Sequence, residues 1–171
     1  ETTAAATGAV GVVRRDPMAM KPFCGYNFGD YWKHWLSFEQ PGRNLPKVFH
    51  VNWFRKGADG RFLWPGFGDN MRVLEWMLRR VAGGVEAVET PIGLLPRSGD
   101  LNADGVGADA LATLLEVDND AWREEVAAIA TYFAGYGERM PEQLLAECGR
   151  IAAALDERAP ATAPRRASSH A

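Results

Sequence analysis

Aromatic rings and glycines alternate through residues 47–70, and this block holds the residue types best suited to bind a flat ligand. The rings of Phe54, Phe62 and Phe67 can stack on the faces of a planar heterocycle, a contact worth ~1–3 kcal/mol per ring. The Pro-Gly-Phe-Gly-Asp-Asn loop that ends the block exposes backbone amide and carbonyl groups, and its glycines allow a ligand to approach closely. One interpretation of the block is therefore a binding site, with rings on the ligand's faces and Asn70 at its edge.

The same residues also fit a purely structural interpretation. Aromatic stripes most often pack in protein cores, and Asn or Asp at the start of a helix is a common cap. Composition and spacing alone favour this structural interpretation over the binding site.

The elements expected to position these residues are a hairpin and a helix. Residues 46–56 alternate as a strand, and residues 61–64 form a shorter returning strand. Phe49, Val51 and Trp53 lie on the face expected to fill the core. Phe54 lies on the opposite, more polar face, where a ligand could reach it. Asp69 or Asn70 is then expected to cap a helix that runs to about Arg80, with an apolar stripe of Val73, Leu74, Met77 and Leu78.

The rest of the chain predicts a mixed fold with a helical second half. Helical periodicity marks residues 27–39, residues 85–106 look irregular, and residues 108–155 predict three helices. The fold class expected is α+β, an α/β-like mixed sheet with flanking helices. Residues 159–171 are of low complexity and are expected to be a disordered tail.

Charge and composition exclude several classes of partner. The net charge of -3 offers no basic field for nucleic acid, and no run of about 18 apolar residues predicts a membrane span. The two cysteines, Cys24 and Cys148, form neither a metal-ligand pair nor a disulfide framework, which is typical of a reducing compartment.

Three stretches resemble the C-terminal region of the GTP-dependent phosphoenolpyruvate carboxykinases. They are KPFCGYNFGDYWKHWLSFEQ, LPKVFHVNWFRKGADGRFLWPGFGDNMRVLEWMLRRV and TPIGLLPRSGDLNADGV. The resemblance is close from residue 1 to about 106, weaker through the helices that follow and absent in the tail. It implies that the chain is a C-terminal fragment, with residues 1–158 forming part of the nucleotide-binding, kinase-like domain.

The resemblance also implies an activity and a site. The family converts oxaloacetate and GTP into phosphoenolpyruvate, CO2 and GDP, a cytoplasmic step of gluconeogenesis. Phe54, Phe62 and Phe67 resemble its aromatic guanine pocket. The loop resembling the one that reads the guanine edge contains Gly68, Asp69 and Asn70, and Asp69 stands where the family usually has Glu.

Residues 1–12 resemble the family's mobile active-site lid, which shields the enolate from water. Its first residues here are Glu1, Thr2, Thr3, Ala4, Ala5, Ala6, Thr7 and Gly8. The family's Mn2+ and Mg2+ ligands and its phosphate loop are expected upstream of residue 1, so no catalytic or metal residue is expected in this fragment, which should be inactive alone. The complete enzyme is expected to be a monomer that binds neither nucleic acid nor membrane.

A different class of function is also open. The chain could be a non-catalytic nucleotide-binding or interaction module that folds alone. A reading frame that continues upstream into a phosphate loop would favour the lyase.

Overall fold

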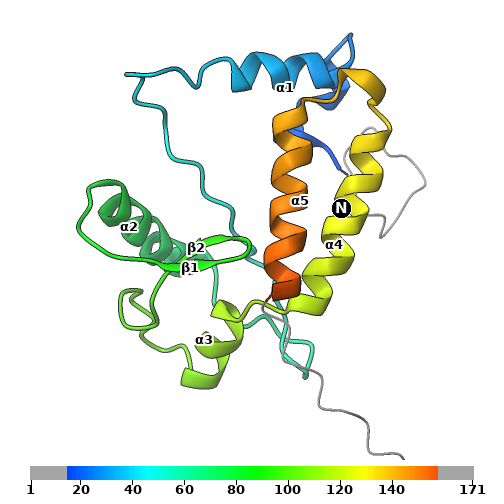
Figure 1. The fold of residues 1–171 in the computed structure, drawn as a ribbon. Helices are drawn as coiled ribbons and strands as arrows, with labels where there is room; N and C mark the ends of the chain where they lie inside the picture. Colours follow the sequence, from blue (N-terminus) through cyan, green and yellow to red (C-terminus); the bar gives the residue numbers. More distant parts are fainter. Residues whose placement is uncertain (1–14, 158–171) are drawn as a thin grey trace, which may run out of the picture. The chain divides into compact units, whose positions relative to one another are not determined.

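The computed structural model describes residues 15–157, which fall into two compact units. Unit 1 comprises residues 15–44 and 124–150, and unit 2 comprises residues 45–123 and 151–157. The sheet seen in these residues has two antiparallel strands, and helices supply the rest of the regular structure (Figure 1).

The helical second half predicted from the sequence is confirmed. It consists of α3 (Ala108–Leu115), α4 (Asn119–Ala134) and α5 (Glu142–Glu157). Together with the small sheet, these helices confirm the α+β class.

Unit 1 opens with two 3-10 turns, η1 (Pro17–Ala19) and η2 (Lys21–Phe23), and continues into helix α1 (Phe28–Leu36). Asn27 caps α1, because its side-chain oxygen accepts a hydrogen bond from the Gly29 amide at 2.8 Å. The helix predicted over residues 27–39 is confirmed, although its last residues form a turn instead.

Trp32 is the centre of the unit 1 core. Its ring lies edge-on to four other rings, with centroid distances of 4.9 Å to Tyr136, 5.0 Å to Phe28, 5.6 Å to Phe133 and 6.4 Å to Tyr132. Met140 is buried beside it. Edge-to-face geometry is the favoured arrangement of aromatic pairs, so this cluster joins α1 to the end of α4 and the start of α5.

The connection between α4 and α5 is tight and passes directly under α1. It contains η4 (Gly137–Arg139), which begins at a glycine with φ of +59°, and the fully buried Pro141. The carbonyl of Arg139 lies so close to Gly29 that a Cβ at that position would be 2.5 Å from its oxygen. A glycine is therefore required where α1 crosses this turn.

The core of unit 2 contains two buried tryptophans, Trp64 and Trp76, together with Val85 and Leu101. Around it lie η3 (Phe67–Asp69), α2 (Asn70–Val81), β1 (Val88–Thr90), β2 (Gly93–Leu95) and α3. Strands β1 and β2 pair with Val88 opposite Leu95 and form a hairpin within residues 85–106, which were predicted to be irregular. That prediction was wrong because a three-residue strand is too short for its periodicity to be read.

The apolar stripe predicted for α2 is half right. Val73 and Met77 pack against the core, but the buried residue of the helix is Trp76, whereas Leu74 and Leu78 are 41% and 72% exposed. Helix α2 carries apolar residues on two faces, and the core uses the face that holds the tryptophan.

The strands predicted at 46–56 and 61–64 do not form as regular elements. Only Lys56 and Phe62 make a β-bridge, although backbone bonds from Leu63 to Arg55 and from Gly57 to Arg61, both 2.9 Å, close the expected turn. Apart from the bond between Leu63 and Arg55, no β-pairing of residues 46–55 is seen in the described chain, so this segment lacks the ladder that defines a strand.

The predicted alternation of faces nevertheless holds along this segment. Phe49, Val51 and Trp53 are partly buried, whereas Val48 is 88% and Phe54 62% exposed. Packing against one side of the chain is enough to produce a period of two.

Candidate binding site

Phe54 and Phe62 meet on the exposed side of the hairpin turn in unit 2. Their ring centroids are 5.9 Å apart with an interplanar angle of 61°, and the side chains are 62% and 56% exposed. The turn itself positions them, because the single bridge places Phe62 opposite Lys56, two residues beyond Phe54. Large rings left this open to solvent are not used by the core and are available to a ligand.

A positive charge lies beside this pair. The Lys56 ammonium is 5.3 Å from the centroid of the Phe62 ring, within the range of a cation–π contact. The ring pair therefore combines two apolar faces with a nearby cation, which suits a flat and negatively charged ligand.

The loop before α2 projects a third ring. Phe67 is 98% exposed and has φ of +48°, directly after Gly66 at +78°. A non-glycine residue with positive φ costs on the order of 1–3 kcal/mol and persists only where the surroundings enforce it. Such strain is more common at functional sites than in ordinary loops.

Three polar contacts hold this loop. The indole N–H of Trp64 donates to the side-chain oxygen of Asn70 at 3.0 Å, and Arg72 forms an ion pair with Asp69 at 3.0 Å. Arg72 also donates to the carbonyl of Asp104. The Asp69 carboxylate thus anchors the loop through Arg72, and α2 begins without a side-chain cap bond.

The structure brings the predicted site residues together in part. Phe54 and Phe62 are neighbours, Gly68 and Asp69 lie in η3, and Asn70 is the first residue of α2. No ring contact to Phe67 is seen among residues 15–157. All six predicted residues belong to unit 2.

Sequence reasoning missed Trp64 and Arg72. Arg72 had a readable signal, because it follows Asp69 at the i,i+3 spacing of helical ion pairs. Trp64 had none, because its contact with Asn70 depends on the path of the intervening loop.

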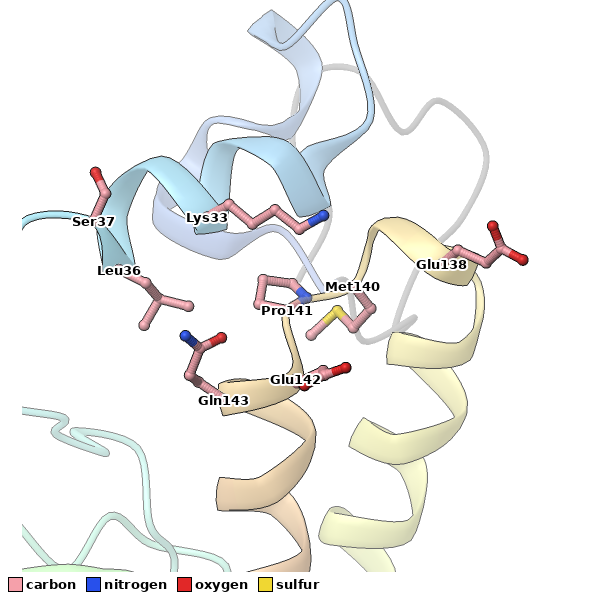
Figure 2. A pocket seen from close by; sticks show the side chains of 8 residues that line it. All are labelled: Lys33, Leu36, Ser37, Glu138, Met140, Pro141, Glu142 and Gln143. Atoms are coloured by element: carbon pink, nitrogen blue, oxygen red, sulfur yellow. The ribbon is translucent and has the colours of Figure 1, made fainter.

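Unit 1 has a hollow of its own, between the end of α1 and the start of α5. Figure 2 shows Lys33 and Leu36 from α1 facing Met140, Pro141 and Glu142. These residues line a hollow of about 490 Å3. Its floor is apolar and its charged groups are solvent-exposed, so it offers no set of converging donors for a particular ligand.

Other chemistry is not seen in the part of the chain that the structure describes. Residues 15–157 contain no group of three His, Cys, Asp or Glu side chains placed to hold a metal ion. Over the same residues, no helix has both the length and the apolarity needed to cross a bilayer. The predicted lid, residues 1–12, and the tail, 159–171, lie outside the described residues.

Comparison with known proteins identifies the family. Residues 1–154 match the family described as the phosphoenolpyruvate carboxykinase C-terminal P-loop domain, and the chain belongs to this family. The resemblance found in the sequence is thereby confirmed, and the match extends through the helical second half.

Individual relatives agree. The chain is 52% identical over 151 residues to the phosphoenolpyruvate carboxykinase [GTP] of Renibacterium salmoninarum, covering 86% of this chain and 25% of the relative. The enzyme of the same name from Thermoplasma volcanium is 48% identical over 147 residues (86% and 25%), and that from Chlamydia muridarum is 52% identical over 153 residues (88% and 26%). The chain thus spans about a quarter of the length of the relatives it matches.

Proposed function

We propose that this chain is the nucleotide-binding C-terminal part of a GTP-dependent phosphoenolpyruvate carboxykinase. The observation that carries the proposal is the near-50% identity to enzymes of that name, sustained over more than four fifths of the chain. The complete protein would convert oxaloacetate and GTP into phosphoenolpyruvate, CO2 and GDP as a carboxy-lyase. Its place would be cytoplasmic gluconeogenesis, and residues 1–158 would form the end of its nucleotide-binding domain.

Guanine recognition is proposed for the exposed block of unit 2. Phe54, Phe62 and Phe67 would hold the base by stacking, while Gly68, Asp69 and Asn70 would meet its edge. Supporting this, all three rings are more than half exposed and none is committed to the core. The cation at Lys56 would lie near the bound nucleotide's negative charge.

The lid role proposed for residues 1–12 rests on the resemblance. Closure would keep water and protons from the enolate until it is phosphorylated. The small side chains of Thr2 to Gly8 would contribute little packing, so ligand binding would have to supply the energy of closure.

The described residues do not fit the Mn2+ or Mg2+ site of such an enzyme. Without a group of three ligand side chains among residues 15–157, any metal would be held by other parts of the protein. What these residues can supply is binding and orientation of the nucleotide.

The test uses a protein of the relatives' length that includes these 171 residues. We call it the full-length protein. Phe67→Ala should raise the Kd of GTP by roughly tenfold, because stacking on one ring is worth ~1–3 kcal/mol. The control is Phe23→Ala, which removes a ring that is 80% exposed but lies in unit 1.

Calorimetric titration with GTP measures both variants. Equal Kd values for the wild type and Phe67→Ala would contradict the proposed site, and absence of GTP binding by the wild type would contradict the proposed function.

A further inference from the structure

Trp64 and Asn70 form a hydrogen bond whose direction is fixed by chemistry. An indole N–H can only donate, so the atom of Asn70 that faces it, 3.0 Å away, is the amide oxygen. The amide nitrogen of Asn70 must then point the other way. An asparagine without such a partner can turn its amide over at little cost, since the two orientations have nearly the same shape.

Both partners of this bond are held in place. Trp64 is 5% exposed and packs with Trp76, Val85 and Leu101, so its ring cannot turn without opening the core. The backbone of Asn70 is helical, and its backbone N–H donates to the carbonyls of Gly68 and Phe67. Turning the amide of Asn70 over would place two donors against each other and leave a buried N–H unpaired.

The group of Asn70 that is not bonded to Trp64 is therefore a donor. No hydrogen-bond partner is seen for its amide nitrogen within the described part of unit 2, whereas its oxygen is occupied by Trp64. Guanine carries a carbonyl oxygen at position 6 of the purine, whereas adenine carries an amino group there. A fixed donor can donate to the guanine carbonyl oxygen, whereas it would face the N–H donors of the adenine amino group.

We propose that Trp64 is a specificity-determining positioning residue, which locks the Asn70 amide so that the site accepts 6-oxopurine nucleotides and rejects 6-aminopurine nucleotides. This inference rests on the proposed nucleotide site and adds the reason for its choice of base. Trp64 acts through Asn70 and does not itself touch the ligand.

The decisive variant is Trp64→Phe in the full-length protein. It keeps a flat apolar ring and removes only the pyrrole portion with its N–H, which frees the Asn70 amide to turn over. The ratio of the ATP to the GTP dissociation constant should fall by roughly tenfold, in line with the usual cost of an unpaired buried donor. Inosine triphosphate, which also carries a 6-oxygen, should follow GTP.

Trp76→Phe is the matched control. Trp76 lies in the same core and is 4% exposed, but its indole N–H has no hydrogen-bond partner among the described residues. Both exchanges lose the same packing volume, so only Trp64→Phe should change the ratio. If the two variants weaken GTP and ATP equally, Trp64 is merely structural and the inference is overturned.

Asn70→Asp tests the same inference without touching the core. One carboxylate oxygen still accepts from Trp64, and the other presents an acceptor where the amide presented a donor. Preference should then shift toward ATP, while the added charge affects both triphosphates alike. A variant that keeps the wild-type preference for GTP would overturn the inference even if Trp64→Phe fails to fold.

Nucleotide binding by the wild-type protein distinguishes failure of the proposed function from failure of this inference alone. If it binds no nucleoside triphosphate, or binds GTP and ATP equally, the proposed function fails and the inference fails with it. If it prefers GTP and Trp64→Phe keeps that preference, the inference alone fails.

Discussion

Tyr132 and Tyr136 share a hydrogen bond of 2.5 Å between their hydroxyl groups in unit 1. The Tyr132 hydroxyl also lies 3.3 Å from the carbonyl of Arg15, and the Lys21 ammonium lies 5.1 Å from the Tyr132 ring. Burial raises the pKa of Tyr132 well above its ordinary value, and the hydrogen bond to Tyr136 raises it further. The neutral phenol is therefore the form that the folded protein stabilises.

This pKa gives the free energy of unfolding a defined pH dependence. Above about pH 10 the unfolded chain loses the Tyr132 proton while the folded protein retains it. Unfolding then releases a proton, so this contribution is constant below about pH 10 and falls as the pH rises further. We expect Tyr132→Phe to make the alkaline decline in stability shallower than in the wild type.

Urea unfolding at several pH values between neutrality and about pH 11 measures this slope. An identical alkaline slope in Tyr132→Phe and the wild type would show that Tyr132 titrates alike in both states.

At the scale of elements, helix α2 has one core face and one exposed apolar face. Trp76 is 4% exposed and touches the unit 2 core, whereas Leu78, half a turn away, is 72% exposed. We expect Trp76→Ala to lower the free energy of unfolding by ~3–5 kcal/mol, through lost burial and the cavity left behind. Leu78→Ala should change it by less than about 0.5 kcal/mol. Denaturant unfolding of both variants measures the difference, and similar losses would mean that both faces are packed.

The crossing of α1 over the α4–α5 turn predicts a second contrast. Gly29→Ala would place a Cβ 2.5 Å from the carbonyl oxygen of Arg139, so α1 or the turn would have to shift. We expect a loss of ~1–3 kcal/mol in the free energy of unfolding. Gly25→Ala is the control, because it adds the same methyl group at a position where a Cβ would meet nothing within 4 Å. Thermal unfolding measures both variants. Equal stability of the two would show that α1 and the turn are not tightly packed at Gly29.

At the scale of the whole molecule, the chain covers about a quarter of its relatives. We expect the 171-residue chain to show no decarboxylation of oxaloacetate and no phosphoryl transfer from GTP. Residues 15–157 hold no metal-ligand set, and the sequence contains no G-x-x-x-x-G-K-[ST] phosphate loop. An assay for phosphoenolpyruvate with Mn2+ present measures this, and metal-dependent turnover by the purified chain would refute it.

The lid proposal concerns motion in the full-length protein. Gly8→Pro should lower kcat more than it weakens GTP binding, because proline would stiffen the backbone of the proposed lid and impede its closure without altering the base pocket. Steady-state kinetics beside a direct GTP titration separates the two effects. Equal losses in both, or in neither, would argue against a gating role.

The sequence by itself determined the features that depend on near neighbours. The family was readable because whole stretches of residues match, and the helix within residues 27–39 and the three C-terminal helices follow from local spacing. The exposure of Phe54 opposite Phe49 and Trp53 was also predictable, since alternation along an extended segment needs only one packed side.

Only the tertiary structure decided which segments and faces predicted from local patterns make contacts with other parts of the chain. Residues 46–56 read as a strand, but within residues 15–157 no second strand lies beside most of them, because pairing depends on segments that spacing cannot identify. Helix α2 offered two apolar faces, and the choice of Trp76 over Leu74 depended on where the rest of the core lies. The bond from Trp64 to Asn70 exists because a loop with two positive φ angles turns the chain back onto the indole, and no periodicity encodes that path.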